Sequence, residues 1–323
     1  MAKKLTIKDI ATLAGVGKST VSRVLNQDSK VSAETRAKIQ AIIQANNFTP
    51  SQSARAMRGQ GNPMIGIIVT RLSSNAENQA LSAMLPLLYA ANCEPIIVES
   101  QMEMHRLQEH LKFFQQRRVD GVILFAFSGL EEQDLQGWQK NLVVIARHYP
   151  KFSCVYYDEQ RAVTLLLEKL LQQGHQKIAY LGVQESDMTT GYLRYQAYLR
   201  FCQTHQLSPY AVLGELSYDS AYQLASAVDF SQVSAIVCAT DTLAIGVVKW
   251  LQENNTTNIA VAGIGNNPLL RFLFPEILSI DLGFTIAGKQ AIAQLFNLLN
   301  KGKIEVNCIE CKLVNNHSFN NDH

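Results

Sequence analysis

Apolar residues at helical spacing mark two short segments at the start of the chain, 6–14 and 18–25. Thr6 and Asp9 have the spacing of a capping box at the start of the first segment. Two glycines, Gly15 and Gly17, lie between the segments and indicate a turn. The inward faces consist of aliphatic residues: Ile7, Ile10, Ala11 and Ala14 in the first segment, and Val21, Val24 and Leu25 in the second. The pattern predicts a helix-turn-helix.

The outward face of the second segment carries Lys18, Ser19, Ser22 and Arg23. A DNA major groove admits one α-helix, and Lys or Arg there can reach the acceptors of guanine. The same residues resemble the end of a phosphate-binding loop, GxxxxGK[ST], but position 12 of the chain is Thr12 instead of the first glycine, and no buried strand precedes it. A small three-helix bundle with a solvated basic face is the remaining alternative.

A third helix is expected from Ser32, with Ile39, Ile42 and Ile43 on one face and a stop at Asn46 or Asn47. The run TPSQSARAMRG then predicts a helix too short to persist alone, because isolated helices below roughly 12–15 residues are marginal in water. GQGNP follows as a junction. We therefore expect a head at 1–49, a hinge helix and linker at 50–63, and a core at 64–323.

From residue 64 onward, short apolar runs alternate with amphipathic segments. The runs are MIGIIV, PIIV, GVILFAF, LVVIA, KIAYLG, AIVCAT, IAVAGIG and LSID, and helices are expected near 75–91, 105–116, 159–173, 194–205, 242–252 and 285–299. Continuous apolar strands between helices predict an α/β core of parallel sheets, arranged as two lobes. Ligands of such sheets bind outside the carboxyl ends of the strands, so a cleft between the lobes is expected there.

Charge is divided unevenly along the 323 residues: positions 1–60 carry ten Lys or Arg against three Asp or Glu, and the remainder carries nineteen against twenty-four. A basic head on a mildly acidic body favours binding of a phosphate backbone by the head. No run resembles a signal peptide or a membrane span, so a cytoplasmic protein is expected. Six cysteines lie scattered in apolar surroundings, and the CxxC pair Cys308 and Cys311 sits in a strand-like run, so no metal site is expected.

At this point the chain resembles the LacI/GalR family of bacterial transcription repressors over essentially its whole length. The resemblance rests on TIKDIATLAGVGKSTVSRVLN, VSAETRAKI, SARAM, VDGVILF, GHQKIAYLG, ATDTLAIG and LSIDLGFTIAGKQA. Within the family, RAMRGQ, IIVTRL, MLP and TTGYLR are most similar to the members that control trehalose utilisation. The resemblance implies a homodimer that binds a palindromic DNA operator, and a periplasmic-binding-protein-like core that senses a small effector. The C-terminal tail lacks the leucine heptads that make some relatives tetramers.

The resemblance also assigns DNA-binding roles to residues of the head and hinge. Lys18, Ser19 and Arg23 are implied to read bases, Thr20 and Ser22 to face phosphates, and Ala54 and Met57 to enter the minor groove; Thr6 and Asn26 complete the set. Met57 stands where the family usually has Leu, and an unbranched apolar Met can still insert between base pairs. A plain packing role for Met57 is the alternative.

The effector-binding residues expected at strand ends are Arg71, Glu77, Ala126, Arg147, Asp187, Met188, Thr189, Thr190, Arg194, Asp241, Thr242, Asn266 and Phe284. Three arginines in one cleft suit an anion better than a neutral sugar, although each one alone has a structural alternative as an ion-pair, helix-surface or domain-linking residue. Thr240, Gly265 and Asn266 depart from the usual family residues. The expected effector is a phosphorylated disaccharide, trehalose 6-phosphate, and the alternatives are another sugar, a sugar phosphate or a purine. No cofactor is expected.

Two other classes of function remain to be compared. A transport-type sugar-binding protein would need an export signal and no basic head. An enzyme would need a nucleophile elbow, a cluster of metal ligands or a glycine-rich dinucleotide turn after a strand, and the sequence has none of these. The sequence therefore favours a non-enzymatic, effector-controlled repressor.

Overall fold

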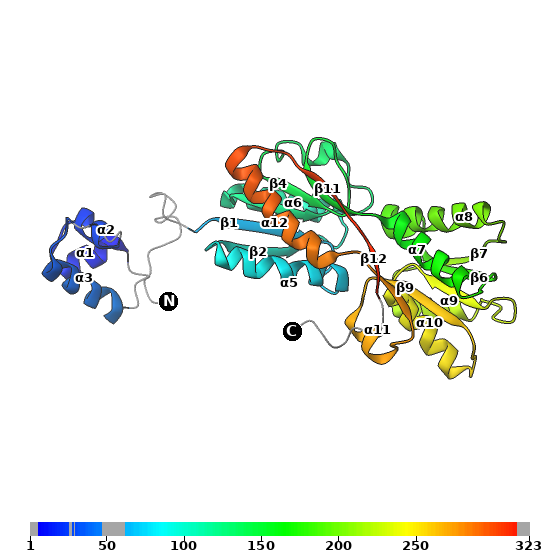
Figure 1. Ribbon diagram of the computed structural model, residues 1–323. Helices are drawn as coiled ribbons and strands as arrows, with labels where there is room; N and C mark the ends of the chain where they lie inside the picture. Colours follow the sequence, from blue (N-terminus) through cyan, green and yellow to red (C-terminus); the bar gives the residue numbers. More distant parts are fainter. Residues whose placement is uncertain (1–5, 26–27, 29, 47–61, 315–323) are drawn as a thin grey trace. The chain divides into compact units, whose positions relative to one another are not determined.

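The computed structural model describes residues 6–25, 28, 30–46 and 62–314 (Figure 1). The chain divides into two compact units, Met1–Asn62 and Pro63–His323. The predicted hinge helix, with Ala54 and Met57, lies outside the described residues, as does Asn26. Among the described residues, no helix is both long and apolar enough to cross a membrane.

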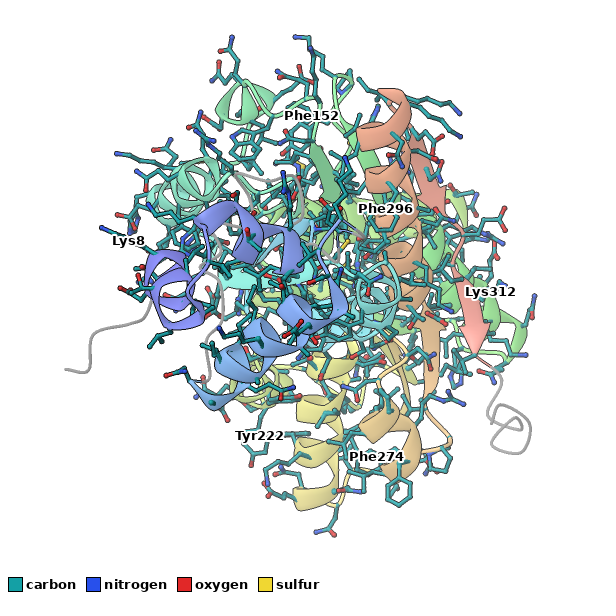
Figure 2. The ribbon with its side chains drawn as sticks, turned by 90° about the vertical axis from the view of Figure 1, so that its left-hand side faces the viewer. Lys8, Phe152, Tyr222, Phe274, Phe296 and Lys312 are labelled. Atoms are coloured by element: carbon teal, nitrogen blue, oxygen red, sulfur yellow. The ribbon has the colours of Figure 1, made fainter. Side chains whose placement is uncertain are left out.

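The described part of the first unit contains three helices: α1 (Ile7–Ala14), α2 (Lys18–Leu25) and α3 (Ala33–Ala45). Their shared core consists of Ile10, Ala11, Ala14, Val21, Val24 and Ile39. Both halves of the predicted capping box form at Thr6 and Asp9, and Gly15 closes α1 with a left-handed φ of 67°. Ser32 caps α3 and Asn46 ends it, as the sequence indicates. Lys8 lies on the outer surface of this unit (Figure 2).

The second unit contains two six-stranded sheets, which form its two lobes. The first sheet has the order β11-β5-β4-β3-β1-β2, and all its strand pairs are parallel. Its strands are β1 (Met64–Val69), β2 (Glu94–Glu99), β3 (Gly121–Phe125), β4 (Leu142–Ile145), β5 (Ser153–Tyr157) and β11 (Val306–Ile309). The second sheet has the order β12-β10-β9-β8-β6-β7, in which only β12 runs antiparallel to its neighbour. Its strands are β6 (Ile178–Val183), β7 (Tyr210–Gly214), β8 (Ala235–Cys238), β9 (Ala260–Ile264), β10 (Leu278–Asp281) and β12 (Lys312–Val314).

Helices cover both faces of each sheet. In the first lobe, α5 (Asn75–Ala90) and α12 (Phe284–Lys301) pack on one face, and α6 (Met104–Arg117) packs on the other. Strand residues alternate between the two sides: Ile65, Ile67 and Val69 belong to the core under α5, whereas Ile68 packs with Phe114 of α6. Phe152 is fully buried in this second cluster (Figure 2).

In the second lobe, α7 (Glu159–Gln172) packs with α8 (Arg194–Thr204), and α9 (Tyr218–Ala225) packs with α10 (Asp241–Glu253) (Figure 1). A short helix, α11 (Pro268–Leu273), follows β9, and a 3₁₀ turn spans Glu132–Leu135 in the first lobe. A π-helical segment, η2 (Met188–Leu193), leads directly into α8.

The backbone crosses between the lobes three times: from β5 to α7, from β10 to α12, and from β11 to β12. Figure 1 shows the last crossing as the long red segment that joins one sheet to the other. The two-lobed α/β architecture with parallel sheets predicted from the sequence is confirmed.

Candidate functional site

A cavity of about 460 Å³ lies between the two lobes, at the carboxyl ends of their strands. The first lobe contributes the segments that follow β1, β3 and β4, and the second lobe contributes those that follow β6, β8 and β9. Every effector residue expected from the sequence lines this cavity except Met188 and Asn266. The lining set is therefore Arg71, Glu77, Ala126, Arg147, Asp187, Thr189, Thr190, Arg194, Asp241, Thr242 and Phe284.

Met188 and Asn266 lie next to residues that line the cavity but do not line it themselves. The side chain of Met188 is exposed, while its backbone N–H donates a hydrogen bond across the cleft to the Ser128 hydroxyl of the other lobe at 2.7 Å. Asn266 has a left-handed φ of 49° and its side chain accepts a hydrogen bond from Arg271 at 3.1 Å. The next residue, Asn267, faces the cavity instead. A second hydrogen bond between the lobes joins Gln79 of α5 to the Gly265 carbonyl at 3.3 Å.

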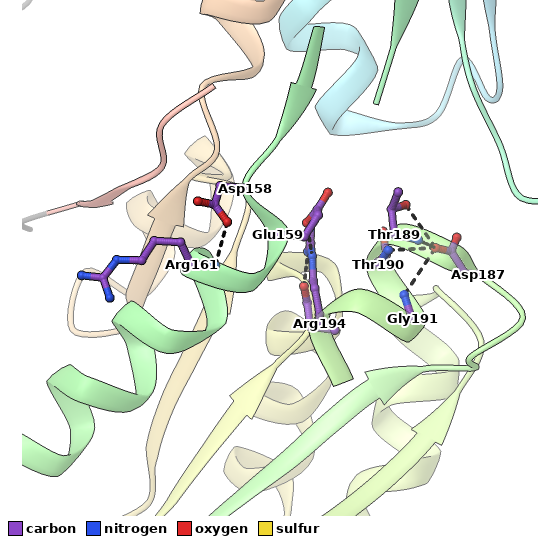
Figure 3. A network of polar contacts seen from close by, with 9 residues as sticks. Asp158, Glu159, Arg161, Asp187, Thr189, Thr190, Gly191 and Arg194 are labelled. Carbon is purple, nitrogen blue, oxygen red and sulfur yellow. Dashed lines mark hydrogen bonds and ion pairs between the residues drawn. The ribbon is translucent and has the colours of Figure 1, made fainter. Parts of the chain in front are cut away.

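Arg194 enters the cavity with its charge already compensated. It is 4% exposed, and its Nε donates to Glu159 Oε2 at 2.6 Å (Figure 3). Its Nη1 also donates to the Ala239 carbonyl at the end of β8. Since a buried guanidinium needs such partners to offset its desolvation, Arg194 contributes directed N–H donors to the cavity and little net charge.

Arg71 and Arg147 form no ion pair among the described residues, although burial raises the pKa of the Glu77 carboxyl and the charge of Arg71 acts to lower it. Arg147 donates to the carbonyls of Phe127 and Leu130, at 3.2 and 2.8 Å, and its guanidinium lies 5.3 Å from the Tyr149 ring centre. Arg71 donates to the Met102 thioether at 3.6 Å. Carbonyls, rings and thioethers orient a guanidinium without cancelling its charge, so both residues bring net positive charge to the first-lobe side of the cavity.

Asp187 organises the opposite wall. Its Oδ1 accepts hydrogen bonds from the backbone N–H groups of Thr189, Thr190 and Gly191, at 3.0, 2.8 and 3.3 Å (Figure 3). Gly191 allows the π-helical turn to form, because a Cβ at this position would overlap the Gln184 carbonyl. The result is a widened turn that presents two threonines to the cavity, a form of irregularity that is frequent at functional sites.

Two further acids that line the cavity, Asp241 and Glu77, are themselves largely buried. Burial raises the pKa of Asp241 to about 6, although hydrogen bonds from the Asn267 N–H at 2.7 Å and the Ser279 hydroxyl act to lower it. Burial likewise raises the pKa of Glu77, whose carboxylate accepts hydrogen bonds from the Thr70 N–H and hydroxyl. These acids position the loops at the ends of β1 and β9.

Several lining residues were not anticipated from the sequence. Glu159 follows β5, a strand that periodicity did not identify, and Met102 belongs to the turn after β2. Tyr157 and Phe284 pack edge to face with ring centres 5.1 Å apart, and both line the cavity. The remaining unanticipated lining residues include Phe125, Phe127, Ser128, Leu216, Ser217, Tyr218 and Asn267. Recognising SCVYY as a strand would have placed Glu159 at a strand end.

The head presents a second candidate surface. In α2, Val21 and Val24 are buried, whereas Lys18, Ser19 and Arg23 are exposed and Thr20 and Ser22 are half-buried. Thr6 is exposed at the start of α1. Arg23 lies 4.0 Å from Asp28, and both side chains stay accessible to solvent, so this ion pair is weak. Val21 and Val24 thus face inward and Lys18, Ser19 and Arg23 face outward, as the sequence predicts, whereas Ser22, predicted to face outward, and Leu25, predicted to face inward, are both half-buried.

Comparisons with known proteins match both parts of the chain, the head and the two-lobed core, to protein families. Residues 6–51 match the family described as bacterial regulatory proteins, lacI family. Residues 167–319 match a periplasmic binding protein-like domain. Over 300 residues the chain is 47% identical to the HTH-type transcriptional regulator TreR of Salmonella typhimurium, with 93% of this chain and 95% of that protein covered.

Two solved repressor structures are also similar to this chain. The trehalose repressor from Escherichia coli is 41% identical, with a TM-score of 0.77, and the match covers 78% of this chain and 100% of that chain. The lac repressor dimer bound to operator and the anti-inducer ONPF has a TM-score of 0.84 at 23% identity, and the match covers 97% of this chain and 98% of that chain. The second similarity shows the fold alone.

Proposed function

This chain belongs to the lacI family of bacterial regulatory proteins, and we propose that it is a cytoplasmic, dimeric repressor of a trehalose-utilisation operon whose effector is trehalose 6-phosphate. Its relatives are transcriptional regulators, not enzymes. The head at 1–49 binds operator DNA, residues 50–63 form the hinge, and the core at 64–323 binds the effector and a second copy of the chain.

For operator binding, the exposed side of α2 supports the assignment. Lys18, Ser19 and Arg23 read base edges in the major groove, where Arg and Lys reach the O6 and N7 acceptors of guanine. Thr20 and Ser22 hold phosphates and fix the register of the helix on the duplex. Thr6, Asn26, Ala54 and Met57 complete the DNA-binding set proposed for this chain.

The observation that carries the effector assignment is the difference between the three arginines. Arg194 forms an ion pair with Glu159. Among the described residues, the guanidinium groups of Arg71 and Arg147 donate hydrogen bonds only to uncharged groups, and the Arg71 guanidinium acts on the Glu77 carboxyl through its charge alone. A neutral disaccharide would leave two positive charges partly desolvated and unpaired, which costs free energy. A phosphate monoester supplies a matching dianion for Arg71 and Arg147, while Arg194 donates to sugar hydroxyls, as do the polar groups near Asp187.

Residues of both lobes suit the sugar rings. Thr189, Thr190 and Thr242 of the second lobe supply hydroxyls that both donate and accept, and the edge-to-face pair Tyr157 and Phe284 of the first lobe supplies an apolar surface for the ring faces. The cavity of about 460 Å³ lies in the usual size range of small-molecule sites. We therefore expect the phosphate end of the ligand at Arg71 and Arg147, and the sugar end between the threonines of the second lobe and the aromatic pair of the first.

Calorimetry with trehalose and trehalose 6-phosphate tests the assignment. Charge-assisted hydrogen bonds contribute about 1.5–3 kcal/mol each, so we expect the phosphate ester to bind about a hundredfold more tightly or better. Arg71→Ala and Arg147→Ala should each remove most of that preference. Arg161→Ala is the matched control, because Arg161 pairs with Glu168 on α7 and is not among the residues that line the cavity. Figure 3 shows its side chain pointing away from Glu159 and Arg194.

Equal affinity for the two ligands in the unmodified chain would contradict the anion assignment and favour a neutral sugar or a purine. Preference for the ester that survives both arginine substitutions would contradict the assignment of the phosphate to the first lobe. Operator binding measured with and without each ligand then gives the sign of regulation.

A further inference from the structure

Two consecutive residues in the turn after β2 adopt a left-handed backbone conformation that their residue types do not favour. Gln101 and Met102 adopt left-handed φ angles of 54° and 59° in succession. Left-handed backbone is sterically unfavourable for a non-glycine residue, and such strain persists where the surroundings enforce it. Neither residue is Gly, Asn or Asp, the types that adopt this conformation most readily. The strain places the Met102 side chain in the cavity between the lobes.

The surroundings that enforce this turn also hold the loop that carries Arg71. Ser100 is fully buried, its hydroxyl donates to the Val69 carbonyl at 3.2 Å, and the same hydroxyl accepts from the Met102 N–H at 3.4 Å. On the other side, Glu99 accepts from the Leu72 N–H at 3.0 Å. The ends of β1 and β2 are thereby tied together just before and just after Arg71.

The Met102 thioether closes this arrangement by accepting a hydrogen bond from Arg71 Nη2 at 3.6 Å. Within the described part of the chain, the Arg71 side chain forms no other hydrogen bond. Resting on the proposed function, we propose that Met102 is a positioning residue for anion selectivity, which holds the Arg71 guanidinium in the cavity without neutralising it.

The chemistry of sulfur accounts for the choice of residue. A thioether is a weak, uncharged and polarisable acceptor, so it orients a guanidinium and gives way easily when an anion binds. A carboxylate at the same place would cancel the positive charge, as Glu159 does for Arg194. A purely aliphatic side chain would leave the long Arg71 side chain free to adopt many rotamers, whose loss opposes binding.

Three substitutions of Met102 separate the effects of side-chain size, hydrogen-bond acceptor and charge. Met102→Leu keeps the size and removes the acceptor, Met102→Gln restores an uncharged acceptor, and Met102→Glu introduces a charged one. Gln is compatible with this backbone, since Gln101 already adopts it. The quantity to measure in the full chain is the affinity for trehalose 6-phosphate divided by the affinity for trehalose, because a general distortion of the cavity changes both.

We expect Met102→Leu to lower this ratio about threefold to tenfold, in line with the strength of contacts to a thioether. Met102→Gln should restore at least half of the loss on a logarithmic scale. Met102→Glu should lower the ratio furthest, by about tenfold or more, because the carboxylate pairs with Arg71 and repels the phosphate.

The Arg71→Ala variant distinguishes a failure of the proposed Met102 role from a failure of the proposed phosphate binding. If Arg71→Ala lowers the ratio and Met102→Leu leaves it unchanged, the positioning role is overturned and the proposed function stands. A Met102→Gln ratio as low as that of Met102→Leu also overturns the role, because an acceptor then does not matter. If Arg71→Ala itself leaves the ratio unchanged, both the phosphate assignment and the role of Met102 fail.

Discussion

Replacing Arg194 by Met should destabilise the core more than any surface substitution. The Arg194 and Glu159 side chains are each 5% exposed and their charged atoms lie 2.6 Å apart, so the substitution leaves the Glu159 carboxylate buried without its counterion. Removing one partner of a buried ion pair costs about 3–5 kcal/mol. We therefore expect the free energy of unfolding of Arg194→Met to fall by about this amount.

The double variant Arg194→Met/Glu159→Gln isolates the cause. It removes the unpaired charge together with the cation, so it should be clearly more stable than Arg194→Met, with a coupling of about 2 kcal/mol or more in the double-mutant cycle. Arg161→Ala serves as the control, since its ion pair with Glu168 is exposed at 47% and 40% and should contribute less than about 1 kcal/mol.

Urea unfolding followed by circular dichroism measures the unmodified chain, Arg194→Met, Glu159→Gln, the double variant and Arg161→Ala, and the free energies can be compared if the m-values are equal. A loss below about 1 kcal/mol for Arg194→Met would refute the inference that burial makes this pair interdependent. A double variant as unstable as the sum of the two single variants would also refute it, because the destabilisation would then come from lost packing and not from the stranded charge.

Three further predictions concern other parts of the molecule. Arg23→Ala should weaken specific operator binding by about 1–3 kcal/mol and spare random DNA, which footprinting on both substrates can measure; equal losses would make Arg23 a phosphate contact. Gly288→Ala should destabilise the core by about 1–3 kcal/mol in urea unfolding, because a Cβ would overlap the Ala80 carbonyl where α12 crosses α5, and Lys289→Ala on the exposed side is the control. Asp241 has its pKa raised to about 6 in the folded protein, so its contribution to stability is greatest below pH about 4 and falls by up to about 3 kcal/mol as the pH rises to about 6. The stability difference between the unmodified chain and Asp241→Asn should therefore slope between those pH values and level off above them, and a flat difference would contradict the raised pKa.

The sequence identified most elements because their patterns were long or fully apolar. The runs at β1, β3, β6 and β9 are buried on both faces and contain few polar residues, so periodicity and composition agree. It did not identify β7 or α9. β7 is an edge strand whose residues are all half-buried, and α9 spans only eight residues, so tertiary packing and not local pattern specifies both.

For the candidate site, strand-end reasoning located Arg71, Arg147 and Arg194 but not the partners that differentiate them. Glu159 lies 35 positions before Arg194 and Met102 lies 31 positions after Arg71. No local period relates residues at such separations. Their pairing follows from which strands are neighbours, and thus from the three-dimensional structure alone.

The three crossings of the backbone between the lobes set an order of assembly during synthesis. The second lobe is built almost entirely from residues 158–283 and lacks only the short edge strand β12 from later in the chain. The first lobe begins at residue 64, yet it needs α12 to cover α5 and β11 to complete its sheet. Domains usually fold in the order in which they emerge from the ribosome. Here the lobe that emerges first can be completed only after the second has emerged, so the apolar surface of α5 that α12 covers stays exposed on the nascent chain until residue 301 has emerged.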